Sequence, residues 1–201
     1  MTMNLVFDVG NVLIRWRPEQ AVAHHFPDPA QALAYLDSVG FYDWNYRQDG
    51  GRGFAEGFAA LEAAHPGRAA PLADYPARFG DTIREPIAGS WALIDRLAAR
   101  GHRLFAITNF AAYTWPVALT LHPRLGTAFA DTVVSGIEGL LKPEAAIYRL
   151  LLERNALDPA TCLFIDDSAA NVAGARAVGM AAHHFTTPGG LEADLRRHGL
   201  V

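Results

Sequence analysis

The chain has 201 residues, of which 51% are hydrophobic and 19% are charged, and its formal net charge is −4. This composition is typical of a globular protein with one substantial core and room for a smaller second unit. The mildly acidic balance, without a run of Lys or Arg, argues against a nucleic-acid-binding surface. No apolar stretch approaches the ~18 residues that a membrane span needs.

The single cysteine, Cys162, excludes an internal disulfide and lies in an apolar run, which indicates a buried residue in a reducing compartment. The N-terminal sequence MTMNLVFD has neither a basic segment nor a small-residue cleavage site. We therefore expect a cytoplasmic monomer or homodimer that acts on a small molecule, without nucleic-acid or membrane partners.

The first predicted strand covers residues 4–8, and a long helical segment follows it. Residues 15–85 contain no convincing strand, and their patterns predict helices over 18–25, 28–38, 53–65 and 72–83, separated by the Gly- and Pro-rich stretches QDGGRG and HPGRAAP. This segment divides the chain into a discontinuous core domain, residues 1–14 and 86–201, and an inserted α-helical cap, residues 15–85. A cap at this point would lie above the carboxyl ends of the strands, where open α/β sheets bind ligands.

From residue 86 onward, helices and strands alternate. Helical patterns cover 90–100, 111–121, 143–155 and 169–178, and apolar runs predict strands at 103–108, 132–135, 162–166 and 181–185. The runs are apolar throughout, which is typical of parallel strands that are buried on both faces. The order predicts an α/β fold with a doubly wound, Rossmann-like parallel sheet.

Polar side chains follow several of these strands and would gather at one edge of a parallel sheet. They are Asp8, Thr108, Asn109, Lys142, Asp166 and Asp167. An Asp nucleophile can accept a phosphoryl group as a mixed anhydride, which divides a difficult hydrolysis into two easier steps. Three neighbouring carboxylates require a cation, and oxygen-only ligands favour magnesium (Mg²⁺). A Lys ammonium and a Thr hydroxyl could stabilise the charge that develops on the phosphoryl oxygens.

The sequences FDVGNVL, ITN, LKPEAAIY and FIDDSAANVAGA resemble, in order and spacing, the four motifs of the haloacid dehalogenase superfamily. The resemblance covers essentially the whole chain and includes a helical cap between motifs one and two. It implies Asp8 as the nucleophile, Thr108 as the phosphate-orienting hydroxyl and Lys142 as the charge-neutralising ammonium. It further implies a magnesium site made of Asp8, the Gly10 carbonyl and Asp167, with Asp166 bound to the metal or to its waters.

Gly10 departs from the pattern of the metal-dependent phosphatases of that superfamily, which usually carry a second Asp there as the general acid and base. General acid catalysis contributes roughly 10²–10⁴-fold in rate. The loss is tolerable if the leaving group departs easily, as a sugar anomeric oxygen does, or if a His or an acid of the cap replaces the missing group. The variant most resembles the subgroup that contains sugar-1-phosphatases.

These features favour a magnesium-dependent hydrolase of small phosphomonoesters, sugar phosphates among them, that acts through an aspartyl-phosphate. One alternative is a metal-independent 2-haloacid dehalogenase, which Asp166 and Asp167 disfavour because dehalogenases generally have serine-type residues there. Another is a catalytically weak protein that binds phosphate esters, which the absence of a side chain at Gly10 would explain.

Several further residues have two open interpretations. Asn109 either caps the helix that follows or contacts the substrate, and Asn171 either supports the metal site or stabilises a turn. Gly10 and Asn11 are expected to turn the backbone beneath the phosphate. The aromatic segment 41–52, with Arg47 and Arg52, either forms the inner face of the cap or packs the cap helices together. Members of the adjacent pairs His24–His25 and His183–His184 should point to different sides, with structural or exposed roles.

Overall fold

The computed structural model of the chain describes residues 3–201 and contains one five-stranded parallel sheet. Its strands are β1 (Asn4–Phe7), β2 (Arg103–Thr108), β3 (Asp131–Val134), β4 (Cys162–Asp166) and β5 (Ala181–His184), in the spatial order β3-β2-β1-β4-β5. Strand β1 is central, and Phe7 pairs with Ala106 on one side and with Ile165 on the other. The predicted doubly wound α/β fold is confirmed.

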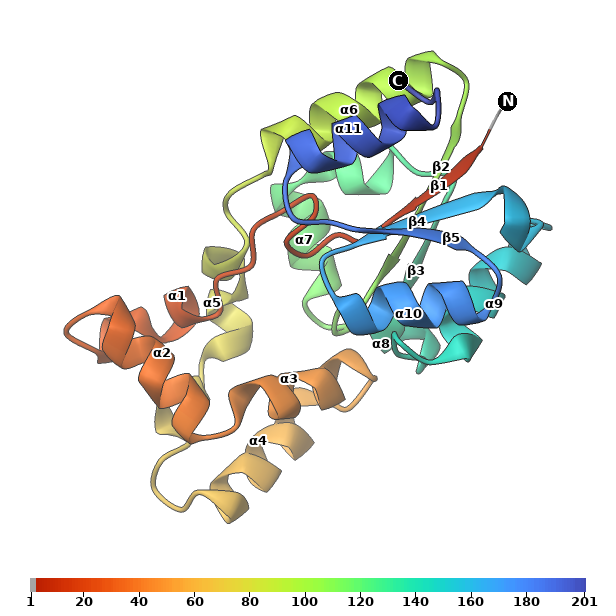
Figure 1. Cartoon of the computed structure of the whole chain (residues 1–201). Coiled ribbons are helices and arrows are strands. Elements are labelled where there is room, and N and C mark those ends of the chain that lie inside the picture. Colours follow the sequence, from red (N-terminus) through yellow and green to blue (C-terminus); the bar gives the residue numbers. More distant parts are fainter. Residues whose placement is uncertain (1–2) are drawn as a thin grey trace.

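Helices cover both faces of the sheet. The helices that lie between β1 and β2 in the sequence are α1 (Glu19–Val22), α2 (Pro29–Ser38), α3 (Phe41–Asp49), α4 (Phe54–Ala64), α5 (Tyr75–Thr82) and α6 (Ala88–Ala99). The later ones are α7 (Trp115–Leu121), α8 (Ser135–Glu138), α9 (Ala145–Arg154), α10 (Ala169–Ala177) and α11 (Pro188–Arg197). Helices α6 and α11 pack together on one face, and α9 and α10 pack together on the other (Figure 1). In the described part of the chain, no helix combines the length and the apolar character needed to cross a bilayer.

Successive strand residues enter different cores, which explains why the strands are apolar throughout. In β1, Leu5 and Phe7 belong to the larger core and Val6 to the smaller one. In β4, Phe164 and Ile165 are likewise fully buried in opposite cores. Because both faces are covered, the polar residues that end these strands lie at the carboxyl edge of the sheet, where open α/β sheets bind ligands.

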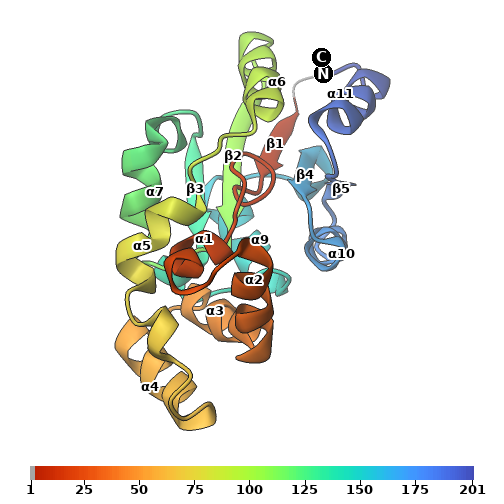
Figure 2. The ribbon, with the colours of Figure 1, turned by 90° about the vertical axis from the view of Figure 1, so that its left-hand side faces the viewer.

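Helices α1–α5 lie beyond the carboxyl ends of the strands, away from the body of the sheet (Figures 1 and 2). Two adjacent segments join them to the sheet. The Arg15 backbone N–H donates to the Glu85 carbonyl at 2.9 Å, and the Ile87 N–H donates to the Leu13 carbonyl at 2.8 Å. The outgoing and returning chains are therefore held together where the helical segment begins and ends.

Two helices, α3 and α11, were not predicted, and α7 begins later than predicted. No helix was expected over 41–49, where Tyr, Trp, Asn and Asp form helices weakly, but burial of Phe41, Trp44 and Gln48 along one face holds α3 together. Helix α7 begins at Trp115 rather than at residue 111, because Pro occupies its first turn and residues 111–114 form a turn. Helix α11 was missed because its Pro-Gly-Gly start is typical of a loop, although the Thr187 side chain caps it.

Candidate active site

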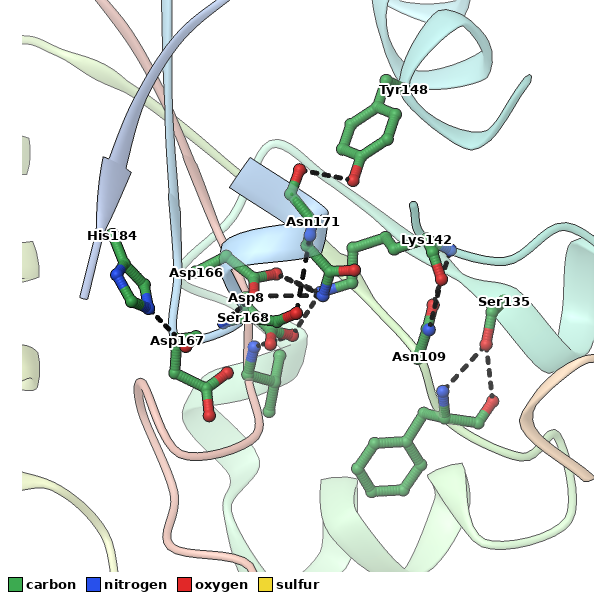
Figure 3. Close-up of polar contacts among 12 residues, drawn as sticks. Asp8, Asn109, Ser135, Lys142, Tyr148, Asp166, Asp167, Ser168, Asn171 and His184 are labelled. Atoms are coloured by element: carbon green, nitrogen blue, oxygen red, sulfur yellow. Dashed lines mark hydrogen bonds and ion pairs between the residues drawn. The ribbon is translucent and has the colours of Figure 1, made fainter. Parts of the chain in front are cut away.

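Asp8, Lys142 and Asp166 form a buried charged cluster at the carboxyl ends of β1 and β4 (Figure 3). The Lys142 Nζ lies 2.8 Å from Asp8 Oδ1 and 2.7 Å from Asp166 Oδ2. Lys142 is 1% exposed, Asp166 is fully buried and Asp8 is 7% exposed, so water screens these charges little. Asp8 and Lys142, predicted as catalytic residues, thus lie in direct contact.

Burial and the neighbouring charges shift the pKa values of Asp8 and Lys142. Burial raises the pKa of Asp8 to about 7, with a further rise from Asp166 and an opposing effect of Lys142. Burial alone would lower the pKa of Lys142, but the two neighbouring carboxylates outweigh it and raise that pKa. Lys142 is therefore a permanent ammonium, whereas Asp8 needs further positive charge nearby to be fully ionised.

Helix α10 fixes the Asp166 carboxylate. The Ser168 N–H donates to Asp166 Oδ1 at 2.8 Å, and the Asn171 side-chain amide donates to both Asp166 oxygens, at 3.0 and 3.1 Å. The Tyr148 hydroxyl in turn donates to the Asn171 carbonyl at 2.8 Å. Asn171 thus hydrogen-bonds to a predicted metal ligand, which supports the interpretation that it stabilises the metal site.

Carboxylate oxygens of Asp8, Asp166 and Asp167 all lie within 4.8 Å of one another. One ammonium faces three carboxylates there, and burial together with the Asp166 charge raises the pKa of Asp167. An all-oxygen donor set with excess negative charge fits a hard divalent cation such as Mg²⁺. Of the predicted metal ligands, the three carboxylates are thus close together, and Gly10 follows Asp8 by two residues in the chain.

Thr108 carries a hydroxyl that is buried without a hydrogen-bond partner among the described residues. A buried hydroxyl without a partner destabilises a fold by about 1–3 kcal/mol. Thr108 ends β2, which pairs with β1, so it lies at the same edge of the sheet as Asp8. An anionic ligand at this position would supply the missing partner.

The Asn109 side chain makes two hydrogen bonds to the backbone of Lys142. Its side-chain amide donates to the Lys142 carbonyl at 3.0 Å, and its side-chain oxygen accepts from the Lys142 N–H at 2.9 Å. The capping interpretation is wrong, because α7 begins six residues later and no side chain caps it. Asn109 therefore positions Lys142, and it also lines the adjacent cavity.

The remaining predicted substrate residues lie in three different settings. Gly10 faces open space, so that a Cβ there would meet no atom within 4 Å. Asn11 has φ +53° and accepts from the Trp16 N–H at 3.1 Å, which closes the turn after Asp8. Arg47 is exposed on α3, and among residues 3–201 it is not part of the lining of the cavity beside Asp8.

A cavity of about 80 Å³ begins at the residues that follow Asp8 and Thr108. Its wall is aliphatic and aromatic: Val9, Ile14, Trp16, Tyr75, Phe79, Ile83, Phe110, Ala111 and Tyr113. Gly10, Asn45, Asp49, Asn109 and Thr114 complete the lining. Phe41 and Trp44 pack within the larger core, which supports the packing interpretation of the aromatic segment. Among the described residues, the aromatic side chains of that segment, Arg47 and Arg52 do not line the cavity, whereas Asn45 and Asp49 of the same segment do.

Asp49 was not identified from the sequence as a functional residue. It is the last residue of α3, and burial raises its pKa to about 8, with a smaller contribution from the charge of Asp8. Its only sequence signal is an acid before two glycines in a helical segment. That signal is common at helix ends and does not indicate where the helix will pack.

The prediction for the first histidine pair was wrong. The His24 and His25 rings do not point apart, because their centroids lie 3.9 Å from each other at a short 3₁₀ turn. The second pair does diverge: His183 contacts Asp194 on α11, and His184 contacts the Asp167 carbonyl. The His184 contact helps to fix the loop that carries Asp167 (Figure 3).

Comparison with known families identifies one match over most of the chain, from residue 2 to residue 179, with the haloacid dehalogenase-like hydrolases. Among curated relatives, a sesquiterpene phosphatase of Aspergillus oryzae is 26% identical over 184 residues, which span 90% of this chain and 88% of the relative. A flavin mononucleotide hydrolase of Arabidopsis thaliana is 30% identical over 112 residues, which span 56% of this chain and 45% of the relative.

Solved structures share the fold at low sequence identity. An alanine variant of an enzyme from Bacteroides thetaiotaomicron, in complex with magnesium and inorganic phosphate, has a TM-score of 0.69 and 18% identity, with 93% of this chain and 95% of that chain covered. An L-2-haloacid dehalogenase from Xanthobacter autotrophicus with covalently bound chloropropionic acid has a TM-score of 0.66 and 17% identity, with 100% and 85% covered.

Proposed function

The chain belongs to the haloacid dehalogenase-like hydrolase family, and from this premise we propose that it is a magnesium-dependent phosphatase of small phosphomonoesters. One observation carries the proposal: Asp8 is paired with the buried Lys142 and faces Asp166 and Asp167, a carboxylate excess that one ammonium does not balance. A dehalogenase of this family has no use for a divalent cation at that point, whereas a phosphatase does.

The residues of the chain supply the parts of a two-step phosphoryl transfer. Asp8 attacks phosphorus and forms an aspartyl-phosphate, which water then hydrolyses. Lys142 and the unpartnered Thr108 hydroxyl bind the phosphoryl oxygens as negative charge develops on them. Asp8, Asp166, Asp167 and the Gly10 carbonyl would hold Mg²⁺, which neutralises the carboxylates and the phosphate dianion when bound.

The cavity favours an apolar leaving group over a sugar. A sugar would need several hydrogen-bond partners, because burying unpaired hydroxyls is costly, and the wall offers mainly aliphatic and aromatic carbon. The relative of Aspergillus oryzae is named as a sesquiterpene phosphatase. A sesquiterpene is a hydrocarbon skeleton, so such a leaving group is largely apolar. We therefore place prenyl-like and other apolar monophosphates ahead of sugar 1-phosphates.

Residues 15–85 would act as the cap of this enzyme, with residues 1–14 and 86–201 as its core domain. Support comes from the paired connecting segments at Arg15 and Glu85 and from the cavity, whose wall joins residues of α3 and α5 to those that follow β1 and β2. The cap would then select the leaving group, and the core would perform the chemistry.

Phosphate release from a substrate panel tests the proposal. The panel contains a prenyl monophosphate, flavin mononucleotide, glucose 1-phosphate and 2-chloropropionate, each with Mg²⁺ and with EDTA. We expect phosphate release only with Mg²⁺, fastest for the prenyl substrate, and none by the Asp8→Asn variant. Chloride release that EDTA leaves unchanged would favour the dehalogenase, and saturable binding without turnover would favour the weak binding protein.

A further inference from the structure

The proposed phosphatase lacks a proton donor at the usual place. Gly10 has no side chain, and the space in front of it is open. A phosphate ester of an ordinary alcohol needs a proton on its leaving oxygen, because an alkoxide is a poor leaving group. Such a donor has to stand in the cavity beside Asp8, where the leaving group would lie.

Asp49 contributes the one carboxyl group among the described residues that line this cavity. The group is half-buried, and it lies close enough to Asp8 and Lys142 for both charges to affect it. Asn45, one helical turn earlier, donates its side-chain amide to Asp49 Oδ2 at 2.9 Å. This hydrogen bond orients the Asp49 carboxyl group on α3.

The core fixes the end of α3 that carries Asp49. The Ser135 hydroxyl donates to the Asp49 carbonyl at 2.6 Å, and the Tyr46 hydroxyl donates to the Lys142 carbonyl at 3.2 Å. Gly50 permits this close approach, because a Cβ there would lie 2.9 Å from Leu141 Cδ1. These contacts fix the last turn of α3, and with it Asp49, against the segments that carry Ser135 and Lys142.

The surroundings keep the Asp49 carboxyl protonated at neutral pH. Burial raises its pKa to about 8, Asp8 adds to the rise, and the Ala111 N–H and Lys142 oppose it. The other titratable groups that face it are the Tyr75 and Tyr113 hydroxyls, whose own pKa values are raised well above the usual tyrosine value. Asp49 is therefore a better proton donor than either tyrosine.

We propose that Asp49 is the general acid of this enzyme and replaces the aspartate that is absent at Gly10. The inference rests on the proposed phosphatase function. As a carboxylate oxygen of Asp8 bonds to phosphorus, the bond from phosphorus to the leaving oxygen breaks, and the Asp49 proton passes to that oxygen. The products of the step are a neutral alcohol, an aspartyl-phosphate at Asp8 and an ionised Asp49.

Two substrates that differ in the need for a proton test this role. The leaving group of 4-nitrophenyl phosphate is stable as an anion, whereas that of 4-nitrobenzyl phosphate is not. For Asp49→Asn we expect kcat/KM for the nitrobenzyl ester to fall by roughly 10²–10⁴-fold and kcat/KM for the nitrophenyl ester to change less than about threefold. The parameter kcat/KM isolates the first phosphoryl transfer from the later hydrolysis of the aspartyl-phosphate.

Asp43→Asn is the matched control, because Asp43 is exposed on the same helix, and it should leave both substrates unchanged. If Asp8→Asn abolishes turnover but Asp49→Asn reduces kcat/KM equally for both esters, or for neither, the assignment of Asp49 as the general acid is wrong. If Asp8→Asn remained active, the phosphatase mechanism itself would be wrong. These failures are therefore distinguishable.

The wild-type enzyme offers a second measurement that needs no variant. With Mg²⁺ saturating, kcat/KM for the nitrobenzyl ester should fall at alkaline pH as Asp49 loses its proton, because burial raises the pKa of Asp49 above its usual value. The nitrophenyl ester should show no such fall. Identical alkaline limbs for the two esters would exclude a proton donor of this kind.

Discussion

Lys142 is the single lysine among the 17 basic residues of the chain. A compact ammonium can donate to two carboxylates from one buried point, whereas the planar guanidinium of arginine is larger and donates along a fixed fork. The two contacts of 2.8 and 2.7 Å, to Asp8 and to Asp166, make use of that compactness. Lysine is therefore better suited than arginine to this contact with two carboxylates.

Replacing Lys142 with methionine should destabilise the protein as well as abolish its activity. Removal of one partner leaves Asp8 and Asp166 buried without a counter-charge, and we expect a loss of about 3–5 kcal/mol at neutral pH. Denaturant unfolding measures it, and the loss should shrink in acid as the carboxylates take up protons. Arg84→Met, which breaks an exposed pair with Asp81, should cost less than about 1 kcal/mol. Equal losses in the two variants would contradict this account.

Thr108→Val should separate stability from activity. The Thr108 hydroxyl has no hydrogen-bond partner within residues 3–201, so its removal should leave the free energy of unfolding unchanged or slightly raised. A lost hydrogen bond to the phosphoryl group should reduce kcat/KM by roughly 10- to 100-fold. Thr82→Val should behave in the opposite way, because the Thr82 hydroxyl donates to the Phe79 carbonyl at 2.7 Å and lies outside the site. A destabilised but active Thr108→Val enzyme would refute the proposed role.

Residues at strand ends were predictable, and Asp49 was not. Asp8, Thr108 and Asp166 each follow an apolar run, and the pairing of parallel strands then requires their carboxyl ends to meet. Asp49 reaches the site only because α3 packs its carboxyl end against Ser135 and Leu141, a contact between distant parts of the chain. No local pattern encodes such a contact.

At the level of elements, α3 connects the helical segment to the core. Its sequence forms helices weakly, and the helix exists because Phe41 and Trp44 are buried and its last turn is docked. The aromatic rings of Phe41, Trp44 and Tyr75 lie 5.3–6.0 Å apart, and they tie α3 to α5. Stability that comes from tertiary packing rather than from propensity explains why the sequence did not predict this helix.

Ser135 is the residue through which the docking of α3 can be tested. Its hydroxyl accepts from the Phe110 N–H at 2.8 Å and donates to the Asp49 carbonyl. In Ser135→Ala, we expect faster amide hydrogen exchange in the last turn of α3 and a loss of about 10- to 100-fold in kcat/KM for alkyl esters, since misplaced catalytic groups are costly. Ser38→Ala on α2, whose hydroxyl donates to Tyr35 within the helix, is the control. Unchanged exchange in α3 would show that the contact does not hold it.

Across the whole molecule, the alternation of helices and apolar runs after residue 86 was sufficient to predict the sheet and its site edge. The insertion of residues 15–85 could be located from its lack of strands, but the pose of its helices depends on contacts with the core at Tyr46 and Asp49. The chemistry of the family therefore follows from the sequence, whereas the selection and protonation of the leaving group depend on how that insertion is placed.

Placing a protonated acid in an apolar cavity should reduce the stability of the whole fold at alkaline pH. Asp49 has a folded-state pKa of about 8 against 3.8 in the unfolded chain, so the folded state binds more protons between these values and stability falls as pH rises through that window. Asp49→Asn removes this effect. In the absence of metal, the variant and the wild type should have the same free energy of unfolding near pH 4. Near pH 8, the free energy of unfolding of the variant should be higher by roughly 2–4 kcal/mol. This difference is smaller than the full pKa shift implies, because Asp49 is partly exposed. Urea unfolding at the two pH values measures the difference, and a variant that is less stable than wild type at pH 8 would show that Asp49 serves the fold rather than the reaction.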